Sequence, residues 1–349
     1  MRGYAIMGAA SDGQGNAVTA FYYFCGHEQW HPETLVDHAV AAEEAGFDGV
    51  MVSDHFHPWV DDAGAGGFSL ATLGAMARAT ERVRLATGVI TPLFRFHPAV
   101  VAQAAATIDR LSGGRFELGV GTGENLNEGP LGLPFPAYPE RAERMREALQ
   151  IMRPLLDGEK LSYTGRYYRT DRARLYSPPL GRVPIRLAAA GPHSAALAGE
   201  MADGLITSVK DPAGSLAKVV EPARAAAAAT GRPDFPIAAT RWTVHAADEE
   251  EAWQALLPWR GLRAPGRLKA VDPADLRRQA DSLPRAEVLG RYPIVAGPDE
   301  MVAAYLPLIE EIGADIVVVQ ITSVHQEETI ALLGEAVLPR LRGAAPPGP

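Results

Sequence analysis

Eight short, nearly all-apolar segments recur along this chain, each followed by a longer amphipathic one, and this alternation constrains the fold more than any other feature. Strands that are buried on both faces have this composition, because neither face meets water. Regular alternation of strands and helices indicates a parallel sheet, since the chain must cross back over the sheet between strands. The eight predicted strands span 18–25, 49–53, 83–90, 115–120, 185–190, 204–208, 237–245 and 316–321.

The amphipathic segments between these strands predict helices, and Gly46 is a stop signal for the first of them. Eight such units favour a closed (β/α)8 barrel, a TIM barrel, over an open doubly wound sheet. Barrels of this class reach this length as a single domain, so 349 residues do not require two. The predicted helices span 31–45, 68–80, 98–111, 138–156, 194–201, 212–230, 298–312 and 327–341.

Two stretches break the alternation. Residues 157–184, after strand four and its helix, predict a small hairpin outside the barrel, and residues 259–293 are polar and arginine-rich and predict a helical excursion after strand seven. Long insertions in a compact domain are commonly lids or binding loops. We therefore predict one α/β barrel domain over 18–342 with insertions after strands four and seven. An N-terminal extension over 1–17 precedes it, and a disordered tail over 343–349 follows it.

Charge and cysteine content narrow the class of partner. The formal net charge of −9 argues against nucleic acid, because proteins that bind it favour basic faces. Cys25 is the only cysteine, so the chain can form neither an internal disulfide nor a cysteine-built zinc site, and a reducing cytoplasm fits. Asp12, Gln14 and Asn16 interrupt the N-terminus before the apolar core of a signal peptide could form. No apolar run reaches the roughly 18 residues that span a bilayer, so we expect no membrane association.

In barrels of this kind the active site lies at the carboxyl ends of the strands, so the residues directly after each strand are the candidates for chemistry. Segment 53–59, Ser-Asp-His-Phe-His-Pro-Trp, brings two histidines and an indole to the mouth. His55 can take a proton from a substrate hydroxyl, because its unperturbed pKa is near neutrality; the alternative is a solvated histidine beside a capping aspartate. Trp59 can pack against a ring and donate one hydrogen bond. His57 is interpreted as structural, and without a third ligand nearby the two histidines predict no metal site.

Glycines follow strands three and four. Gly88 allows close approach of a planar ligand or an unusual peptide bond, although it can also be a plain glycine at a strand end. Segment 119–124, Gly-Val-Gly-Thr-Gly-Glu, is similar to the G-x-G-x-x-G fingerprint of dinucleotide-binding folds. That motif needs a helix to begin within the glycines, and 125–134 carries Gly and Pro instead. A glycine turn that presents Glu124 to the mouth is the preferred interpretation, with a solvated surface glutamate as the alternative.

Strands five and six are followed by residues suited to anions. Segment 190–194, Ala-Gly-Pro-His-Ser, opens a predicted helix whose free amides can bind an anion, although an ordinary serine cap explains it too. Thr207 and Lys210 follow strand six, and Arg278 and Arg291 lie in the excursion. Loops around strands seven and eight commonly build a phosphate site in this fold. Each cation alone is typical of a solvated surface, but together they favour an anionic substrate.

Three motifs in register carry a family resemblance: segment 53–59, segment 97–107 (HPAVVAQAAAT) and segment 119–128 (GVGTGENLNE). Together they resemble the F420-dependent glucose-6-phosphate dehydrogenase branch of the luciferase-like superfamily, and the similarity runs from about Phe21 to Arg342. The resemblance implies a barrel with the deazaflavin coenzyme F420 across its mouth. It also implies a homodimer packed through barrel helices.

The resemblance further implies a role for each residue at the mouth. His55 would be the base that takes the substrate hydroxyl proton, Trp59 would stabilise that step, and Glu124 would protonate the deazaflavin as hydride arrives. Gly88 and Val89 would form a non-prolyl cis peptide bond behind the ring. The other implied cofactor residues are Asp54 beside the deazaflavin, Thr91, Thr122, Gly123 and Asn127 around it, and Ala190, Gly191, His193 and Ser194 at its phosphate-bearing tail.

The resemblance is less complete at the substrate phosphate, which a Thr, two Lys and an Arg hold in the sugar-phosphate enzymes. Thr207 and Lys210 fit this pattern only with one residue deleted between strand six and the lysine, and Arg278 replaces the second lysine, whereas Arg291 matches. Arg and Lys are not interchangeable in such a pocket. We therefore expect a small-molecule substrate with a secondary alcohol or hemiacetal carbon, of the sugar or sugar-phosphate kind, with a phosphate as one candidate feature.

Other functions compete with this one. An F420-dependent epimerase or reductase of a specialised metabolite would use the same residues, and the epimerase would show no net cofactor turnover. An FMN-dependent monooxygenase of the same superfamily would need oxygen and a reductase, but by resemblance Glu124 and the adjacent Asp54 and His55 argue against it. A non-catalytic cofactor-binding protein would not need His55, Trp59 and Glu124 together.

Overall fold

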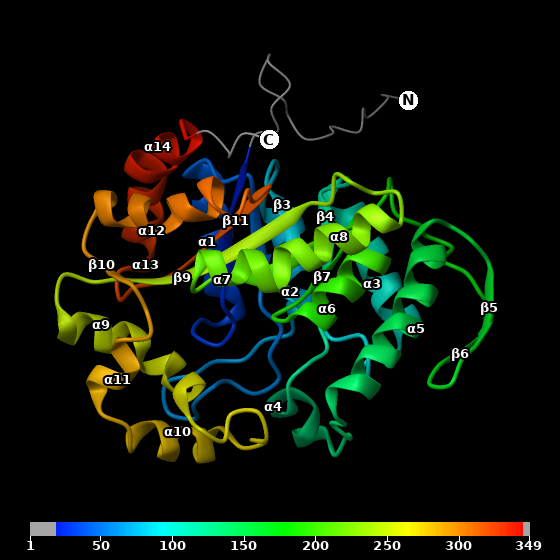
Figure 1. Ribbon diagram of the computed structural model, residues 1–349, viewed down its shortest axis with the longest axis horizontal. Helices are drawn as coiled ribbons and strands as arrows, with labels where there is room; N and C mark the ends of the chain where they lie inside the picture. The colour runs from blue at the N-terminus through cyan, green and yellow to red at the C-terminus, as the bar shows by residue number, and fades with distance from the viewer. Residues whose placement is uncertain (1–18, 345–349) are drawn as a thin grey trace.

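The computed structural model describes residues 19–344, which form a closed barrel of eight parallel strands ringed by helices (Figure 1). Strands pair in the order β9-β11-β1-β2-β3-β4-β7-β8, and β8 pairs back to β9, which closes the barrel. These strands are β1 (Ala20–Cys25), β2 (Gly49–Val52), β3 (Arg84–Thr87), β4 (Phe116–Val120), β7 (Ile185–Ala188), β8 (Gly204–Ser208), β9 (Ile237–His245) and β11 (Ile316–Thr322). The predicted barrel and its eight strands are confirmed. The predicted extension over 1–17 and most of the predicted tail lie outside the described residues.

Helices cover the outside of the barrel and lie close to their predicted positions. Several begin with a proline in the first turn, where its fixed φ suits a helix and its missing N–H is not needed. They are α1 (Pro32–Glu44), α2 (Ser69–Ala79), α3 (Pro98–Ser112), α5 (Tyr138–Leu156), α6 (Pro192–Met201), α7 (Pro212–Ser215), α8 (Glu221–Ala229), α12 (Pro298–Glu310), α13 (Gln326–Leu332) and α14 (Leu338–Arg342). Within residues 19–344, no helix has both the length and the apolar character needed to cross a bilayer.

Both predicted insertions are present. Strands β5 (Leu161–Thr164) and β6 (Arg169–Ala173) form an antiparallel hairpin apart from the barrel sheet. The excursion after β9 contains α9 (Glu249–Leu256), α10 (Pro273–Asp281) and α11 (Arg285–Leu289). It ends in β10 (Ile294–Val295), which pairs with the last residues of β9. The sequence did not predict β10, because two apolar residues are too few to indicate a strand.

The loop after β4 contains one short helical turn that the sequence did not predict. The sequence predicted a glycine turn that presents Glu124, and not the helix of a dinucleotide-binding motif, because 125–134 carries Gly and Pro. A single turn, α4 (Asn125–Glu128), does begin there, with Glu124 at its N-cap position. The turn is only four residues long, and Gly132 follows it with a positive φ of 71°. The run therefore builds a compact loop rather than the long helix of a dinucleotide-binding motif.

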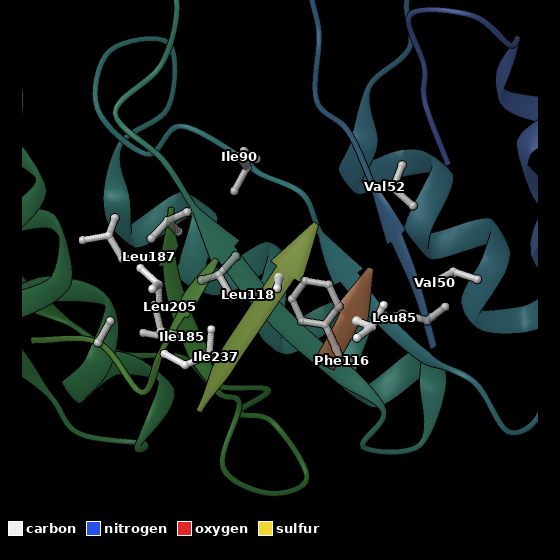
Figure 2. Close-up of a cluster of buried hydrophobic side chains, with 14 of the residues drawn as sticks. Val50, Val52, Leu85, Ile90, Phe116, Leu118, Ile185, Leu187, Leu205 and Ile237 are labelled. Carbon is white, nitrogen blue, oxygen red and sulfur yellow. The ribbon is translucent and has the colours of Figure 1, made fainter. Parts of the chain in front are cut away.

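Two apolar layers hold the barrel together. Figure 2 shows side chains such as Val50, Leu85, Leu118 and Leu187 on successive strands, and these belong to the buried cluster between strands and helices. A second, smaller cluster fills the barrel itself and comprises Tyr22, Met51, Ala86, Ile206, Ala238, Ile316 and Val318. Because strand side chains alternate between the two layers, each strand is buried on both faces, as its composition predicted.

A buried charge group accompanies the inner cluster. Glu117 on β4 is 4% exposed and pairs with both Arg84 and Arg186. Burial alone would raise the pKa of Glu117, but the two guanidinium groups more than offset it and the pKa falls below its usual value. These residues precede the carboxyl ends of their strands, so this group braces the barrel below the mouth.

Candidate active site

Loops from several strand ends meet at the carboxyl end of the barrel, where the sequence placed the site. His55, after β2, lies with its Nε2 3.3 Å from Oε1 of Glu28, which follows β1. Its Nδ1 lies 3.0 Å from the backbone oxygen of His57. A carbonyl oxygen can only accept, so Nδ1 carries a proton, while Nε2 faces the Glu28 carboxylate. The ring of Trp59 lies 5.0 Å from that of His55.

Glu28 is held in place from its other side. Its carboxylate is 4% exposed and accepts a hydrogen bond from Ser53 Oγ, which in turn accepts one of 2.8 Å from the backbone N–H of His27. His55 and Glu28 therefore form an imidazole–carboxylate pair at the mouth of the barrel.

Asp54 belongs to a buried group behind the histidine. It pairs with Arg95 and accepts a hydrogen bond of 2.8 Å from Ser69 Oγ. Arg95 also contacts Glu128 in α4, with its Nε 3.8 Å from Oε1 and its backbone N–H donating to Oε2 at 3.3 Å. Glu128 is fully buried, and burial raises its pKa although Arg95 opposes the effect. Arg95 thus joins the loop after β2 to the loop after β4.

Asn127 makes a second link between the same loops. Its Oδ1 accepts a hydrogen bond of 2.8 Å from the backbone N–H of Phe56. Glu124 stands at the start of this turn, and burial raises the pKa of its carboxyl, while His55 and Arg267 lower it. The acid and the base predicted from the sequence are therefore brought into one mouth, close enough for their charges to interact.

The predicted cofactor residues after β3 and β4 form a close-packed backbone surface. The peptide bond between Gly88 and Val89 is cis, as the resemblance implied. Gly123 has a φ of +80°, and a Cβ there would lie 3.0 Å from Cγ2 of Thr91. Only glycine fits comfortably at such a position. Thr122 belongs to the same loop, and its carbonyl accepts a bond of 3.4 Å from Arg141.

The predicted anion site lies at the N-terminus of α6. This helix begins at Pro192, two residues earlier than expected, and Gly191 is its N-cap residue. Ser194 Oγ donates to the carbonyl oxygen of Gly191 at 2.9 Å, while Ala190 and His193 are exposed beside it. Tyr138 on α5 lies beside Ser194, and Arg141 is one turn further along the same helix. The sequence reasoning did not select Arg141. Its Nη1 donates to the carbonyl oxygen of Gly123 at 3.1 Å.

The predicted substrate cations are only partly brought together. Thr207 is buried at the end of β8, and Lys210 follows it. Burial lowers the pKa of Lys210, and nearby Arg263, Arg267 and Arg291 lower it further. Arg278, in contrast, pairs with Asp275 on its own helix and is 63% exposed. Arg263 and Arg267 were not selected from the sequence, because several arginines in the excursion could have filled the role.

The excursion also covers part of the mouth. The backbone oxygen of Lys269 accepts a bond of 2.8 Å from Asn125 Nδ2, and that of Val271 lies 2.9 Å from Nδ1 of His57. The guanidinium of Arg267 lies over the ring of Trp59, 5.9 Å from its centroid. A cavity of about 490 Å³ lies elsewhere, beside α9 and α11, and none of the predicted site residues lines it.

Comparison with known proteins identifies the family. Residues 19–315 match the model of the family described as luciferase-like monooxygenase, and the chain belongs to this family. A protein of Nakamurella multipartita named F420-dependent glucose-6-phosphate dehydrogenase is 40% identical over 327 residues, which cover 92% of this chain and 96% of that protein. A protein of Rhodococcus jostii named F420-dependent glucose-6-phosphate dehydrogenase 1 is 37% identical, with 94% of this chain and all of that protein covered.

Solved structures agree with this kinship. An F420-dependent secondary alcohol dehydrogenase, determined in complex with an F420–acetone adduct, superposes with a TM-score of 0.85 at 30% identity. The match covers 92% of this chain and 98% of that one. The F420-dependent tetrahydromethanopterin reductase of Methanopyrus kandleri, at 23% identity and a TM-score of 0.75 over 93% of this chain and 100% of that one, shares the fold. The family and the barrel expected from the sequence are thus confirmed.

Replacing Arg95 with methionine tests the buried group behind the site. The change leaves Asp54 and Glu128 buried without their shared cation, and breaking such a group costs about 3–5 kcal/mol. We expect the free energy of unfolding, measured with denaturant at neutral pH, to fall by this amount. The loss should shrink as the pH is lowered, because protonation of the two carboxyls removes their uncompensated charge. Arg340→Met is the control, since its pair with Asp299 is exposed and worth no more than about 1 kcal/mol. An equal loss in both variants would contradict the role of Arg95.

Proposed function

We propose that this chain is an F420-dependent oxidoreductase that transfers a hydride between a secondary alcohol or hemiacetal carbon and C5 of the deazaflavin. One observation carries the proposal: a base with its own counter-charge, His55 with Glu28, shares the barrel mouth with an acid of raised pKa, Glu124. Oxidation of an alcohol by hydride transfer also releases the hydroxyl proton, so such a site needs a group to receive it.

The enzyme class and the coenzyme expected from the sequence are confirmed by the relatives. Both curated proteins above are named F420-dependent dehydrogenases, and so is the superposed secondary alcohol dehydrogenase. The substrate in each of these names is a property of that relative and not of this chain. For this chain, a sugar or sugar-phosphate alcohol remains part of the proposal.

The residues present suit F420. Arg141 Nε is buried and has no hydrogen-bond partner among the described residues. The N-terminus of α6 is a ready site for an anion such as the phosphate of the coenzyme tail. Ala190, Gly191, His193 and Ser194 would hold that tail, as the resemblance implied. Asp54, Gly88, Val89, Thr91, Thr122, Gly123 and Asn127 would hold the ring.

When bound, F420 supplies a deazaflavin ring whose C5 accepts or returns a hydride. His55 Nε2 takes the hydroxyl proton of the substrate, and the Glu28 carboxylate stabilises the resulting imidazolium. Trp59 packs against the His55 ring and limits its orientation. Glu124 keeps its proton to higher pH than an exposed glutamate and is the acid on the cofactor side.

The expected homodimer and the cytoplasmic location also stay proposals. Three exposed apolar side chains near α2 and α3 support a protein contact there: Phe68 is 47% exposed, Val100 52% and Leu111 41%. Cys25 is buried and free, which suits a reducing compartment.

The cofactor is tested by fluorescence titration of the purified protein with F420 and, separately, with FMN. We expect tight binding of F420 and weak binding of FMN, because the glycine-lined surface and the α6 terminus together suit the deazaflavin and its phosphate tail. Tight binding of FMN with none of F420 would contradict the proposal and favour the oxygen-dependent monooxygenase.

The base is tested by His55→Ala. Loss of a general base costs about 10²–10⁴-fold in rate, so F420 reduction by an accepted alcohol should fall by that factor. The affinity for F420 should stay within a few-fold, because His55 faces the substrate side. His325→Ala, at an exposed histidine paired with Glu328, should leave both unchanged. Lost F420 binding in His55→Ala would contradict the assignment of the base.

The acid is tested by the pH profile of kcat/KM for F420 reduction. Burial raises the pKa of Glu124, so the protonated, active form persists above the pH at which an exposed glutamate has lost its proton. Activity should fall as the pH rises through this raised pKa. Glu124→Gln should be slower and should lack that alkaline limb, because the amide does not titrate. If Glu124→Gln shows the same fall in kcat/KM at alkaline pH, another group is responsible for that fall.

A further inference from the structure

An exposed apolar rim borders part of the barrel mouth. Four large side chains form it, and each is well exposed: Phe56 47%, Leu131 42%, Leu268 70% and Val271 38%. They come from three separate loops, since Phe56 follows β2, Leu131 ends the 3-10 turn Gly129–Leu131 behind α4, and the other two lie in the excursion after β9. Single exposed apolar side chains are ordinary, whereas a group of them is typical of a binding surface.

The three loops are packed against one another, so these side chains form one group. A Cβ placed on Gly129 would lie only 2.7 Å from Cγ2 of Val271, so Val271 packs directly on the turn that carries Leu131. The backbone oxygen of the same valine lies 2.9 Å from Nδ1 of His57, whose ring lies 5.2 Å from that of Phe56. The rim is therefore a single surface built from loops that are far apart in the sequence.

Polar groups of these loops bind one another and leave the apolar side chains exposed. Asn125 Nδ2 donates to the backbone oxygen of Lys269, the residue after Leu268, at 2.8 Å. The backbone N–H of Phe56 donates to Oδ1 of Asn127 at 2.8 Å. The rim therefore offers a ligand its apolar side chains rather than these hydrogen-bonding groups.

The rim is continuous with the candidate site. Phe56 directly follows His55 in the loop after β2. Ala270, which lies between the two rim residues of the excursion, packs against the buried apolar cluster that contains Trp59. Trp59 in turn lies beside His55, with 5.0 Å between the ring centroids. A substrate whose hydroxyl reaches His55 therefore has apolar surface leading away from that hydroxyl.

We propose that the rim of Phe56, Leu131, Leu268 and Val271 is a substrate subsite that binds an alkyl or aryl group of the alcohol. The inference rests on the proposed function in taking the occupant to be part of the alcohol substrate. Covering the rim removes apolar surface from water, which favours binding. A sugar alone presents hydroxyl groups there and would leave this surface unpaired, so the subsite favours an alcohol that carries an apolar substituent.

The test compares two secondary alcohols of equal chain length, 2-octanol and 1-(2-methoxyethoxy)-2-propanol, in which two ether oxygens replace methylene groups. Calorimetric titration of the purified protein with F420 present should show roughly tenfold tighter binding of 2-octanol, the affinity equivalent of two buried methylenes. The double variant Leu268→Asn with Val271→Thr nearly keeps the size of both side chains but removes apolar atoms from them. It should lower the preference about fourfold, the equivalent of one methylene.

Leu180→Asn is the matched control and should leave the preference unchanged. Leu180 is 56% exposed, and its backbone N–H donates to Asp109 near the C-terminus of α3, away from the mouth. Equal binding of the two alcohols by the wild type, binding of neither, or an unchanged preference in the double variant would overturn the inference.

Two further outcomes separate the alternatives. If the double variant keeps the preference but changes the oligomeric state in analytical ultracentrifugation, the rim is a contact between copies of the chain and the inference is wrong. If the preference and its loss in the double variant are seen but the protein neither binds nor reduces F420, the proposed function alone is wrong.

Discussion

The rest of the structure depends on closure of the parallel strand ladder. β9 pairs with β8 on one side and β11 on the other, so no barrel strand is left with an open edge along its length. Because all eight strands run in the same direction, their carboxyl ends meet at one rim. Loops that are far apart in the sequence are thereby brought within hydrogen-bonding distance. Glu28 and His55, at the ends of β1 and β2, are an example.

Charge is distributed unevenly along the barrel axis. Below the mouth, Glu117 sits between two arginines, and behind the mouth Arg95 sits between two acids. Both groups are internally compensated, as buried charges must be if the fold is to tolerate them. The cations around Lys210 differ: among residues 19–344 their one ion pair is the 3.9 Å contact between Arg291 and Glu287.

Much of the fold could be predicted because its signal is local. The helix predicted over 138–156 is observed with the same bounds, and every predicted strand overlaps an observed one. His55 and Glu124 could be proposed as site residues for the same reason, because each lies in a long local motif. Glu28 and Arg95 were missed because each pairs with a residue in another loop. The sequence analysis selected Arg278 among several arginines of the excursion, since sequence alone does not show where an irregular segment places each of them.

The geometry also gives the proposed acid and the proposed base different surroundings. His55 has its Nδ1 proton held by a backbone carbonyl oxygen, and its Nε2 faces the Glu28 carboxylate. Glu124 is governed mainly by burial, which favours the neutral acid. The two groups interact but have separate partners, so each can hold the protonation state that its step requires.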